Sequence, residues 1–356
     1  MNPLVSILIP AHNAEDWVAD TIRSAVAQTW PRKEIIVVDD GSTDGTADVA
    51  RRFASKQVAV ICRENQGAAA TRNHALQFCQ GDYIQWLDAD DILALDKIER
   101  QLAALREGDG ERTLLSSAWA TFSYRTSHAQ SVPTSLWQDL SPVEWFLKKM
   151  GENLYMQTAT WLTSRRLTQA AGPWDTRLLS DDDVEYFCRV LMASDRIRFV
   201  PDARVFYRIT PASRLSYVGT SDKKKEALVL SLKLQIQHIR SVEDSDRVRK
   251  SCLACLKSRL GEFYPERPDL VAELQALAEQ LGGAREIPRL RRKYAWMQPI
   301  FGAKVAKSAQ IELPRMKAWV VRCWDKAIHS LETSRVFFSH ILKPKSIARE
   351  DSQRRD

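Results

Sequence analysis

The chain has 356 residues, of which 44% are hydrophobic and 27% are charged, and its net charge is +7. This length can bury one large core or two smaller ones, and the composition is that of a soluble globular protein. No apolar run is long enough to span a bilayer, and residues 1–10 lack the basic region and cleavage site of a signal peptide. The scattered cysteines, with one C-x-x-C pair at Cys252 and Cys255, predict buried thiols in a reducing cytoplasm rather than a zinc site.

The first 95 residues alternate predicted strands and helices with short loops. Apolar runs rich in Val and Ile predict strands, and Pro10 is expected to end the first of them. The predicted strands are 4–9, 35–38, 58–62 and 83–87, and the predicted helices are 15–26, 44–53 and 67–79. Such alternation indicates right-handed crossovers and therefore a Rossmann-like, doubly wound, mostly parallel α/β sheet flanked by helices.

Two of the predicted strands run directly into acidic residues. Asp39 and Asp40 follow the second strand, and Asp88, Asp90 and Asp91 follow the fourth. Ligands bind beyond the carboxyl ends of parallel strands, and carboxylates placed there suit Mg²⁺ or Mn²⁺ carrying phosphates. The alternative is that Asp90 or Asp91 caps a helix that begins near Ile92, and that the first pair caps a turn.

Four motifs in order carry a family resemblance. They are Val5–Glu15, Val37–Asp44, Asn65–Asn73 and Leu87–Asp91, within residues 4–95. Together they resemble the family 2 glycosyltransferases, inverting nucleotide-sugar transferases of the GT-A fold. His12 stands where the family usually has Tyr or Phe.

The resemblance implies a role for each motif. Residues that would border the nucleotide are Pro10, Ala11, His12, Glu15, Asn65 and Gly67, with Asp40 accepting a hydrogen bond from the base. Arg72 would pair with phosphate or with the metal-site carboxylates, the alternative being a structural ion pair. Asp90 would be the main protein ligand of Mg²⁺ or Mn²⁺, and Asp88 would meet the ribose or a metal-bound water. A family histidine after Tyr207-Arg208 is replaced by Ile209, so metal binding is expected to be weak before the nucleotide arrives.

The second half of the predicted catalytic domain is less regular. We expect helices at 93–106 and 164–171 and a helix that begins at Pro142, strands at 114–124 and 156–163, and a hairpin or two short strands at 198–209. Ser141, Pro142 and Glu144 form a strong helix start. Single Trp residues here are more often core than sugar platforms, and Trp161 is the one that we assign to the acceptor site.

An acidic run at Asp181–Asp183 precedes Glu185 and Arg189. The family carries an acidic pair ahead of an Arg on a helix, and its second acid is the general base. The resemblance therefore assigns Asp182 and Asp183 to catalysis, with Asp183 as the base and a possible offset of one residue. Crowding by neighbouring acids should raise the pKa of that carboxyl, which suits uptake of a proton.

The C-terminal region differs in charge from the rest. Residues 285–349 contain fifteen Lys or Arg against four acids, so the remaining chain carries a net charge of −4. Residues 221–280 predict three amphipathic helices, and aromatic residues alternate with basic ones from Arg289 onward. This pattern suits an anionic membrane surface or a helical cap on the catalytic domain, and the acidic half argues against nucleic acid.

The sequence thus predicts a GT-A catalytic domain at 1–218, with a nucleotide half at 1–106 and an acceptor half at 107–218, and a helical region at 219–356. The expected activity is metal-assisted inverting transfer from a nucleoside-diphosphate sugar, with a UDP-sugar favoured, in surface polysaccharide or glycoconjugate synthesis. The acceptor would be a saccharide, lipid-linked or other hydroxyl, and the location cytoplasmic or peripheral on the inner face of the membrane. The alternatives are a non-catalytic nucleotide-binding scaffold and a nucleotidyltransferase.

Overall fold

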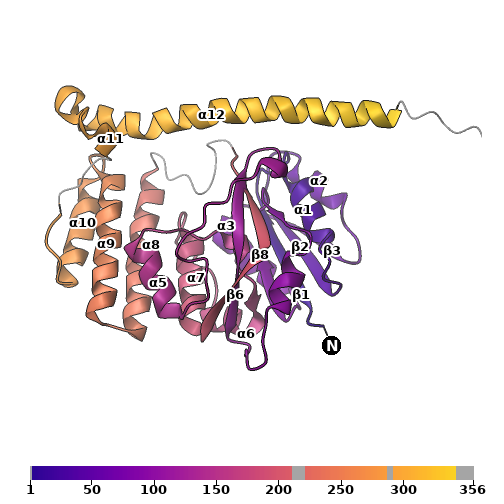
Figure 1. Ribbon diagram of the computed structural model, residues 1–356, viewed down its shortest axis with the longest axis horizontal. Coiled ribbons are helices and arrows are strands. Elements are labelled where there is room, and N and C mark those ends of the chain that lie inside the picture. Colours follow the sequence, from indigo (N-terminus) through magenta and orange to yellow (C-terminus); the bar gives the residue numbers. More distant parts are fainter. Residues whose placement is uncertain (1, 211–220, 287–291, 342–356) are drawn as a thin grey trace, which may run out of the picture.

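The computed structural model describes residues 2–210, 221–286 and 292–341. Its central sheet has the strand order β3-β2-β1-β4-β7, parallel except for β7. The strands are β1 Val5–Ala11, β2 Lys33–Asp40, β3 Val58–Arg63, β4 Tyr83–Trp86 and β7 Thr163–Ser164. The parallel α/β sheet predicted from the alternating pattern is therefore confirmed (Figure 1).

The prediction that Pro10 ends the first strand is wrong, because Pro10 lies inside β1 and pairs in register with Val38 of β2. The reason is the side to which the backbone groups of Pro10 point. In β1, alternate residues bond to β2 and β4, and Leu8 and Pro10 face β4. The β1–β4 pairing ends at Leu8, so the missing N–H of Pro10 removes no bond from the sheet.

Helices cover both faces of this sheet. Ile7 and Ile9 of β1 point into one core cluster, with α1 Val18–Val26, α2 Thr46–Arg51 and α4 Lys97–Ala103. Leu8 points into the other cluster, with α3 Ala68–Phe78, α6 Arg165–Ala171 and α7 Asp182–Ala193. The alternation of side chains along one buried strand thus supplies both cores.

A second, three-stranded sheet has the order β5-β8-β6, with β5 Ile92–Leu93, β6 Thr113–Phe122 and β8 Arg196–Arg208. The hairpin expected at 198–209 is wrong, because β8 is one strand whose register with β6 shifts at a bulge that takes in Pro201. The helix expected at 93–106 begins later, at Lys97, because Ile92 and Leu93 pair with β8 instead.

The strand expected at 156–163 is also wrong. A 3₁₀ turn, η2 Thr158–Thr160, precedes the two-residue strand β7, and the side chain of Gln157 accepts a bond from the N–H of Ala159. A further 3₁₀ turn, η1, spans Thr126–His128. Helix α5, Pro142–Gly151, begins as predicted, since the hydroxyl of Ser141 accepts a bond from the N–H of Glu144.

Three helices follow as predicted: α8 Asp222–Val242, α9 Asp246–Phe263 and α10 Pro268–Gln280. They share a third core cluster with Phe146 and Met150 of α5 and with Cys188 of α7. The predicted domain boundary at 218/219 falls outside the described residues. After α11, Arg292–Ala295, the long helix α12, Gln298–Ile341, bends at Gly302 and crosses the top of the molecule in Figure 1. None of the described helices is long and apolar enough to cross a membrane.

Candidate active site

Arg72 of α3 joins the two acidic segments predicted for the site. Its Nη2 lies 2.9 Å from Oδ1 of Asp88, and its Nη1 lies 2.6 Å from Oδ2 of Asp182. The guanidinium is buried, with its centre 4.4 Å from the ring of Trp174. The sequence prediction left phosphate and carboxylates open as partners of Arg72, and in this structure it contacts one carboxylate from the loop after β4 and one from α7.

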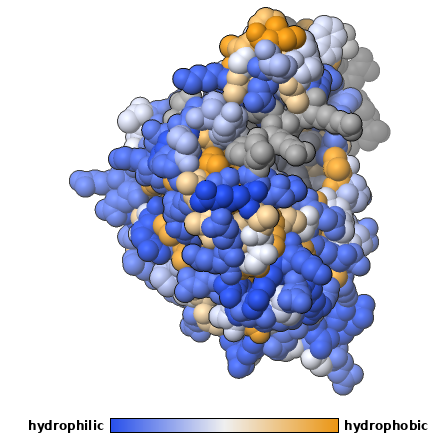
Figure 2. Space-filling view, turned by 90° about the vertical axis from the view of Figure 1, so that its left-hand side faces the viewer, coloured by the Kyte–Doolittle hydropathy of each residue, from blue (hydrophilic) through white to orange (hydrophobic). Residues whose placement is uncertain are grey.

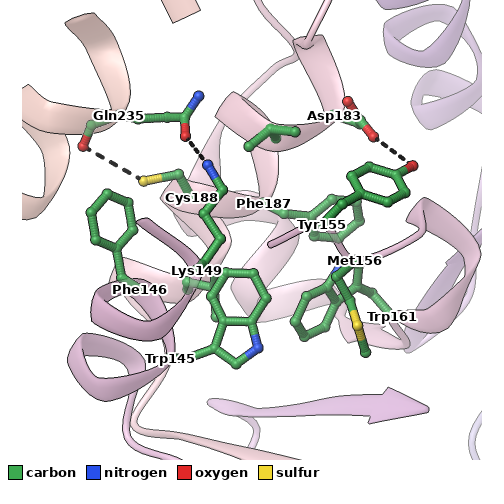
Figure 3. A pocket seen from close by; sticks show the side chains of 12 residues that line it. Trp145, Phe146, Lys149, Tyr155, Met156, Trp161, Asp183, Phe187, Cys188 and Gln235 are labelled. Carbon is green, nitrogen blue, oxygen red and sulfur yellow. Dashed lines mark hydrogen bonds between the residues drawn. The ribbon is translucent and has the colours of Figure 1, made fainter. Parts of the chain in front are cut away.

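Asp183 is the second residue of α7 and faces the pocket drawn in Figure 3. Its Oδ2 lies 3.2 Å from the hydroxyl of Thr158 and 3.4 Å from that of Tyr155. Burial, together with the charges of Asp182 and Asp181, raises the pKa of Asp183 to about 7. A carboxyl with this pKa can accept a proton near neutral pH.

Asp182 differs from Asp183 because it is tied to Arg72. Burial raises its pKa, and the positive charge of Arg72 opposes that rise. The two adjacent acids therefore have different partners, one an ion pair and the other two neutral hydroxyls. This difference favours Asp183 over Asp182 as the proton acceptor.

Trp161 lies in the core of the same region. It is 1% exposed, and its ring stands between those of Trp145 and Phe187, at centroid distances of 5.4 and 5.5 Å. It lines the apolar side of the pocket beside Asp183 (Figure 3). Because its ring faces are covered, Trp161 does not offer a sugar platform in this structure, and its assignment to the acceptor site has no support from the geometry.

In the loop after β4, the adjacent side chains of Asp90 and Asp91 have different partners. Asp91 is fully buried and accepts bonds from Nε2 of Gln157, at 2.5 Å, and from the N–H of Arg208, at 2.8 Å. Nε of Arg208 donates to the carbonyl of Asp90, and its guanidinium packs against the rings of Trp17 and Phe122. Asp91 is therefore a structural anchor of the loop. The alternative that Asp90 or Asp91 caps a helix at Ile92 is wrong, since β5 starts there.

The donor set around Asp90 consists of oxygen atoms. Oδ2 of Asp90 lies 3.4 Å from the hydroxyl of Thr210, while Asp88 is bonded to Arg72. Across the described residues, no three His, Cys, Asp or Glu side chains come close enough together to hold a metal ion. Mg²⁺ is usually held by one or two carboxylates with substrate phosphates, so these residues fit an ion that is shared with a diphosphate.

His12 and Asn65, which the sequence analysis assigned to the nucleotide side, lie close together at the end of β1. Nδ1 of His12 lies 2.9 Å from the carbonyl oxygen of Asp40 and 3.1 Å from Nδ2 of Asn65. Asn65 also donates to that carbonyl, at 2.9 Å. Pro10 and Ala11 close the end of β1 next to His12.

Asp40 and Glu15 mainly hold loops in place. The carboxylate of Asp40 is 3% exposed and accepts bonds from the N–H groups of Gln66, at 3.1 Å, and Gly67, at 2.9 Å. Glu15 accepts from the N–H of Gly45 at the start of α2, at 2.9 Å. The buried Asp40 carboxylate thus fixes the 65–67 loop against β2.

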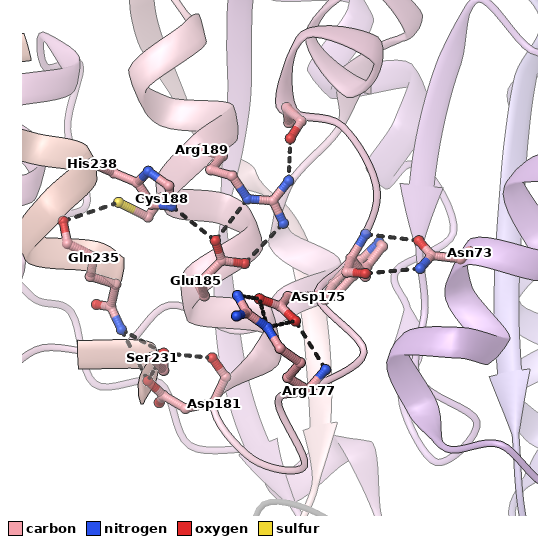
Figure 4. Close-up of polar contacts among 12 residues, drawn as sticks. Asn73, Asp175, Arg177, Asp181, Glu185, Cys188, Arg189, Ser231, Gln235 and His238 are labelled. Carbon is pink, nitrogen blue, oxygen red and sulfur yellow. Dashed lines mark hydrogen bonds and ion pairs between the residues drawn. The ribbon is translucent and has the colours of Figure 1, made fainter. Parts of the chain in front are cut away.

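Several groups that the sequence analysis missed support the acidic segment from the helical region. Asp181 has a φ of 60°, and its Oδ2 accepts bonds from Ser231 at 2.8 Å and Gln235 at 3.1 Å, both on α8. Gln235 in turn accepts from the buried amine of Lys149, at 2.5 Å. Figures 3 and 4 show these contacts. The i, i+4 spacing of Ser231 and Gln235 places both side chains on one face of a helix, which the sequence does indicate. The sequence does not indicate that this face contacts Asp181.

Glu185 and Asn73 have equally definite structural roles (Figure 4). Glu185 accepts bonds from Nε of Arg189 at 2.8 Å and from Nε2 of His238 at 3.0 Å. Asn73 exchanges two bonds, of 2.8 and 2.9 Å, with the backbone of Trp174, and so places that ring beneath Arg72.

The comparisons with known proteins fit this geometry. Residues 6–128, which include β1 to β6 and the loop that carries Asp88 and Asp90, match the family described as Glycosyl transferase family 2. Over this segment the chain is similar to glycosyl transferase family 2. Among the curated relatives of the same segment is the putative teichuronic acid biosynthesis glycosyltransferase TuaG of Bacillus subtilis, 44% identical over 108 residues, which are 30% of this chain and 43% of the relative.

A second relative has a more specific name. The UDP-Glc:alpha-D-GlcNAc-diphosphoundecaprenol beta-1,3-glucosyltransferase WfaP of Escherichia coli is 43% identical over 102 residues, 28% of this chain and 40% of the relative. The chain therefore spans about two-fifths of the length of these curated relatives.

Solved structures extend the likeness beyond the matched segment. S. aureus TarS 1-349 in complex with UDP-GlcNAc superposes with a TM-score of 0.63 at 18% identity, covering 78% of this chain and 82% of that one. The mannosyltransferase PcManGT from Pyrobaculum calidifontis, in complex with GDP-Man and Mn²⁺, gives a TM-score of 0.51 at 18% identity, covering 87% of each chain. At such identities the likeness establishes the fold alone, which is GT-A.

Proposed function

We propose that this protein is an inverting glycosyltransferase that moves a sugar from a nucleoside-diphosphate sugar to a hydroxyl of an acceptor in polysaccharide or glycoconjugate synthesis. The family match and the GT-A fold support a nucleotide-sugar donor. The observation that carries the chemistry is Asp183, which has a pKa of about 7, faces a pocket and lies beside the pair formed by Asp182 and Arg72.

Asp183 accounts for the chemistry at the acceptor. Direct displacement at an anomeric carbon requires a base that removes the proton from the attacking hydroxyl. We propose that Asp183 takes this proton, while Tyr155 and Thr158 hold its carboxylate in position. Arg72 pairs with Asp182, whereas Asp183 contacts two neutral hydroxyls, so Asp183 is the acid that we assign to take the proton.

The donor would lie across the carboxyl ends of β1, β2 and β4. His12, Asn65, Pro10 and Ala11 would border the base and ribose. Asp90, with Asp88 beside it, would hold Mg²⁺ or Mn²⁺ together with the diphosphate, and the ion supplies positive charge that stabilises the departing nucleoside diphosphate. A UDP-sugar is the donor that we favour, since UDP-GlcNAc is the molecule bound in the TarS structure.

The two alternatives lack a supporting observation. A nucleotidyltransferase on a similar sheet would need a glycine-rich triphosphate loop after the first strand, where this chain has Pro10-Ala11-His12-Asn13. A non-catalytic scaffold would not need a buried acid of raised pKa at the pocket, because such a group destabilises the fold at neutral pH.

A donor panel tests the proposal. The protein would be incubated with Mn²⁺ and UDP-, GDP-, CMP- and dTDP-sugars, and release of the free nucleotide would be measured alongside thermal shift. We expect at least one UDP-sugar to stabilise the protein and to release UDP slowly. No release and no thermal shift with any donor would overturn the enzyme assignment.

A further inference from the structure

Helix α12 exposes an apolar side to solvent and contacts the rest of the protein with its polar side. In the described part of the helix beyond Gly302, large apolar side chains are exposed to solvent: Val305, Leu313, Met316, Trp319, Val320, Trp324 and Leu331, at 49–70% exposure. At about 100° per residue, these seven residues lie within an arc of roughly 140°. Ile311 and Val321 are also exposed but lie outside this arc.

The opposite side of α12 holds the helix to the rest of the protein. Asp325 accepts bonds from the N–H of Tyr124 at 2.9 Å and from Nε of Arg125 at 2.7 Å. Glu332 pairs with Arg125 at 3.1 Å, and the ring of His329 stacks on Tyr124. These contacting residues lie nearly opposite the centre of the apolar arc. The helix therefore turns its polar side toward the protein and its apolar side toward solvent.

Basic side chains border the apolar arc. Lys317 lies at one edge and Lys326 at the other, each about 20° outside the arc at 100° per residue. The acids of residues 303–332 are all paired: Glu312 with Arg315, and Asp325 and Glu332 with Arg125. The outward side is thus mainly apolar with a positive border, and the acid that lies inside the arc, Glu312, is paired with Arg315.

The apolar surface continues past the bend at Gly302. Trp296, Ile300 and Phe301 are 54–64% exposed at the beginning of the helix. Figure 2 shows the hydrophobic patch at the top of this end of the molecule, where α11 and the first turns of α12 lie. An exposed apolar surface of this length on a water-soluble helix indicates a contact that is not part of the isolated protein.

We propose that the outward face of α12 lies on an anionic lipid bilayer, parallel to the membrane plane. Two tryptophans, aliphatic side chains between them and lysines at both edges are the composition that binds the interface between headgroups and acyl chains. The contact is peripheral, in keeping with the finding that none of the described helices could cross a membrane.

This orientation has a consequence for the site. Nη1 of Arg322 on α12 donates to the carbonyl of Thr210, whose hydroxyl lies 3.4 Å from Asp90. A membrane beneath α12 would thus lie close to the proposed diphosphate site, where a lipid-linked acceptor could reach Asp183. This last step rests on the proposed function, whereas the membrane contact itself does not.

Vesicle binding tests the proposal without donor or acceptor. The full-length protein would be sedimented with vesicles of phosphatidylcholine, with and without phosphatidylglycerol. We expect binding to the anionic vesicles and at least about tenfold weaker binding to the neutral ones. The double substitution Lys317→Glu/Lys326→Glu should weaken binding by more than about fivefold per lysine, since each charge is reversed. Lys56→Glu/Arg52→Glu, both in the segment between α2 and β3, changes the net charge equally and should not weaken binding.

The apolar contribution has a matched pair of variants on the same helix. Leu313→Ser/Val320→Ser removes two side chains inside the arc, and Ile311→Ser/Val321→Ser removes two similar ones outside it. We expect the affinity of the first variant for anionic vesicles to fall by at least about tenfold, and the second variant to bind like the original protein. Equal binding by both, or no sedimentation with any vesicle, would overturn the proposal. So would a dimer in solution that dissociates on Leu313→Ser/Val320→Ser, because the face would then be a contact between copies.

Failure of this proposal and failure of the proposed function are distinguishable. Donor-dependent release of UDP in the absence of vesicles reports on the catalytic site, and sedimentation without nucleotide reports on α12.

Discussion

Arg72 and Asp182 lie 2.6 Å apart although they belong to different helices, α3 and α7, and this pair connects the proposed nucleotide half of the site to the segment that carries the proposed base. The same guanidinium contacts Asp88 at 2.9 Å. One buried cation thus neutralises a carboxylate next to the proposed metal ligand and a carboxylate next to the proposed base, which makes Arg72 the residue most sensitive to a conservative change.

Arg72→Lys should lower kcat/KM by about 100-fold or more, because a single ammonium cannot bridge two carboxylates as a planar guanidinium does. Arg72 also holds down the pKa of Asp183, so Arg72→Gln, which removes the positive charge, should shift the acidic limb of the pH–rate profile to higher pH. Steady-state kinetics between pH 5 and 9 measure both effects. Arg165→Lys, which alters an arginine bonded to the carbonyls of Gly81 and Cys79, is the control.

Asp183→Asn should retain donor binding and reduce transfer by at least about 1000-fold, because the amide cannot accept the proton of the acceptor. Nucleotide affinity by calorimetry and product formation by chromatography separate the two effects. Asp181→Asn alters the acid that precedes Asp182 and Asp183 in the chain, and this variant should keep most activity. Full turnover by Asp183→Asn would move the role of base to Asp182 or Asp181.

The same substitution should stabilise the protein at neutral pH. The pKa of Asp183 is about 7 in the folded state against a usual value of 3.8. Between these values the folded state binds a proton that the unfolded state has lost, so stability falls as pH rises through this window. We expect Asp183→Asn to have a higher Tm than the original protein at pH 8 and a similar Tm at pH 4. A lower Tm at pH 8 would contradict this account.

Activity should rise with pH and level off above about 7, since Asp183 must be deprotonated to act as a base. Tyr155→Phe removes one hydroxyl that bonds its carboxylate, at 3.4 Å. Loss of that donor should shift the midpoint of kcat/KM to higher pH, while the Tm changes little. A pH-independent rate between 5 and 9 would exclude Asp183 from proton transfer.

Asp90 and Asp91 should give opposite phenotypes. Asp90→Ala should abolish the metal-dependent part of nucleotide binding, measured as the difference in UDP affinity with and without Mn²⁺, and leave the fold intact. Asp91→Ala should lower the free energy of unfolding by about 3 kcal/mol, measured with urea, because it leaves two buried donors on Gln157 and Arg208 unpaired. Unchanged metal-dependent affinity in Asp90→Ala would remove it from the metal site.

The prediction of the fold from sequence was most accurate where periodicity was strong. The buried runs around Ile7 and Val37 indicated parallel strands, and the Ser141 cap indicated the start of α5. Errors came where tertiary pairing overrides a local signal. Pro10 stays in β1 because its neighbour β4 has already ended, and Ile92 joins a strand because β8 is beside it.

For the site, the sequence by itself determined which residue types stand at the strand ends, because motifs such as Asp88-Ala89-Asp90 are contiguous in the chain. It could not decide which acid is structural. Only the tertiary structure separates Asp91, bonded to Gln157 and Arg208, from Asp90, and Asp182, paired with Arg72, from Asp183. The physical reason is that the charge and pKa of an acid depend on partners contributed by distant segments, including α8, which no local pattern specifies.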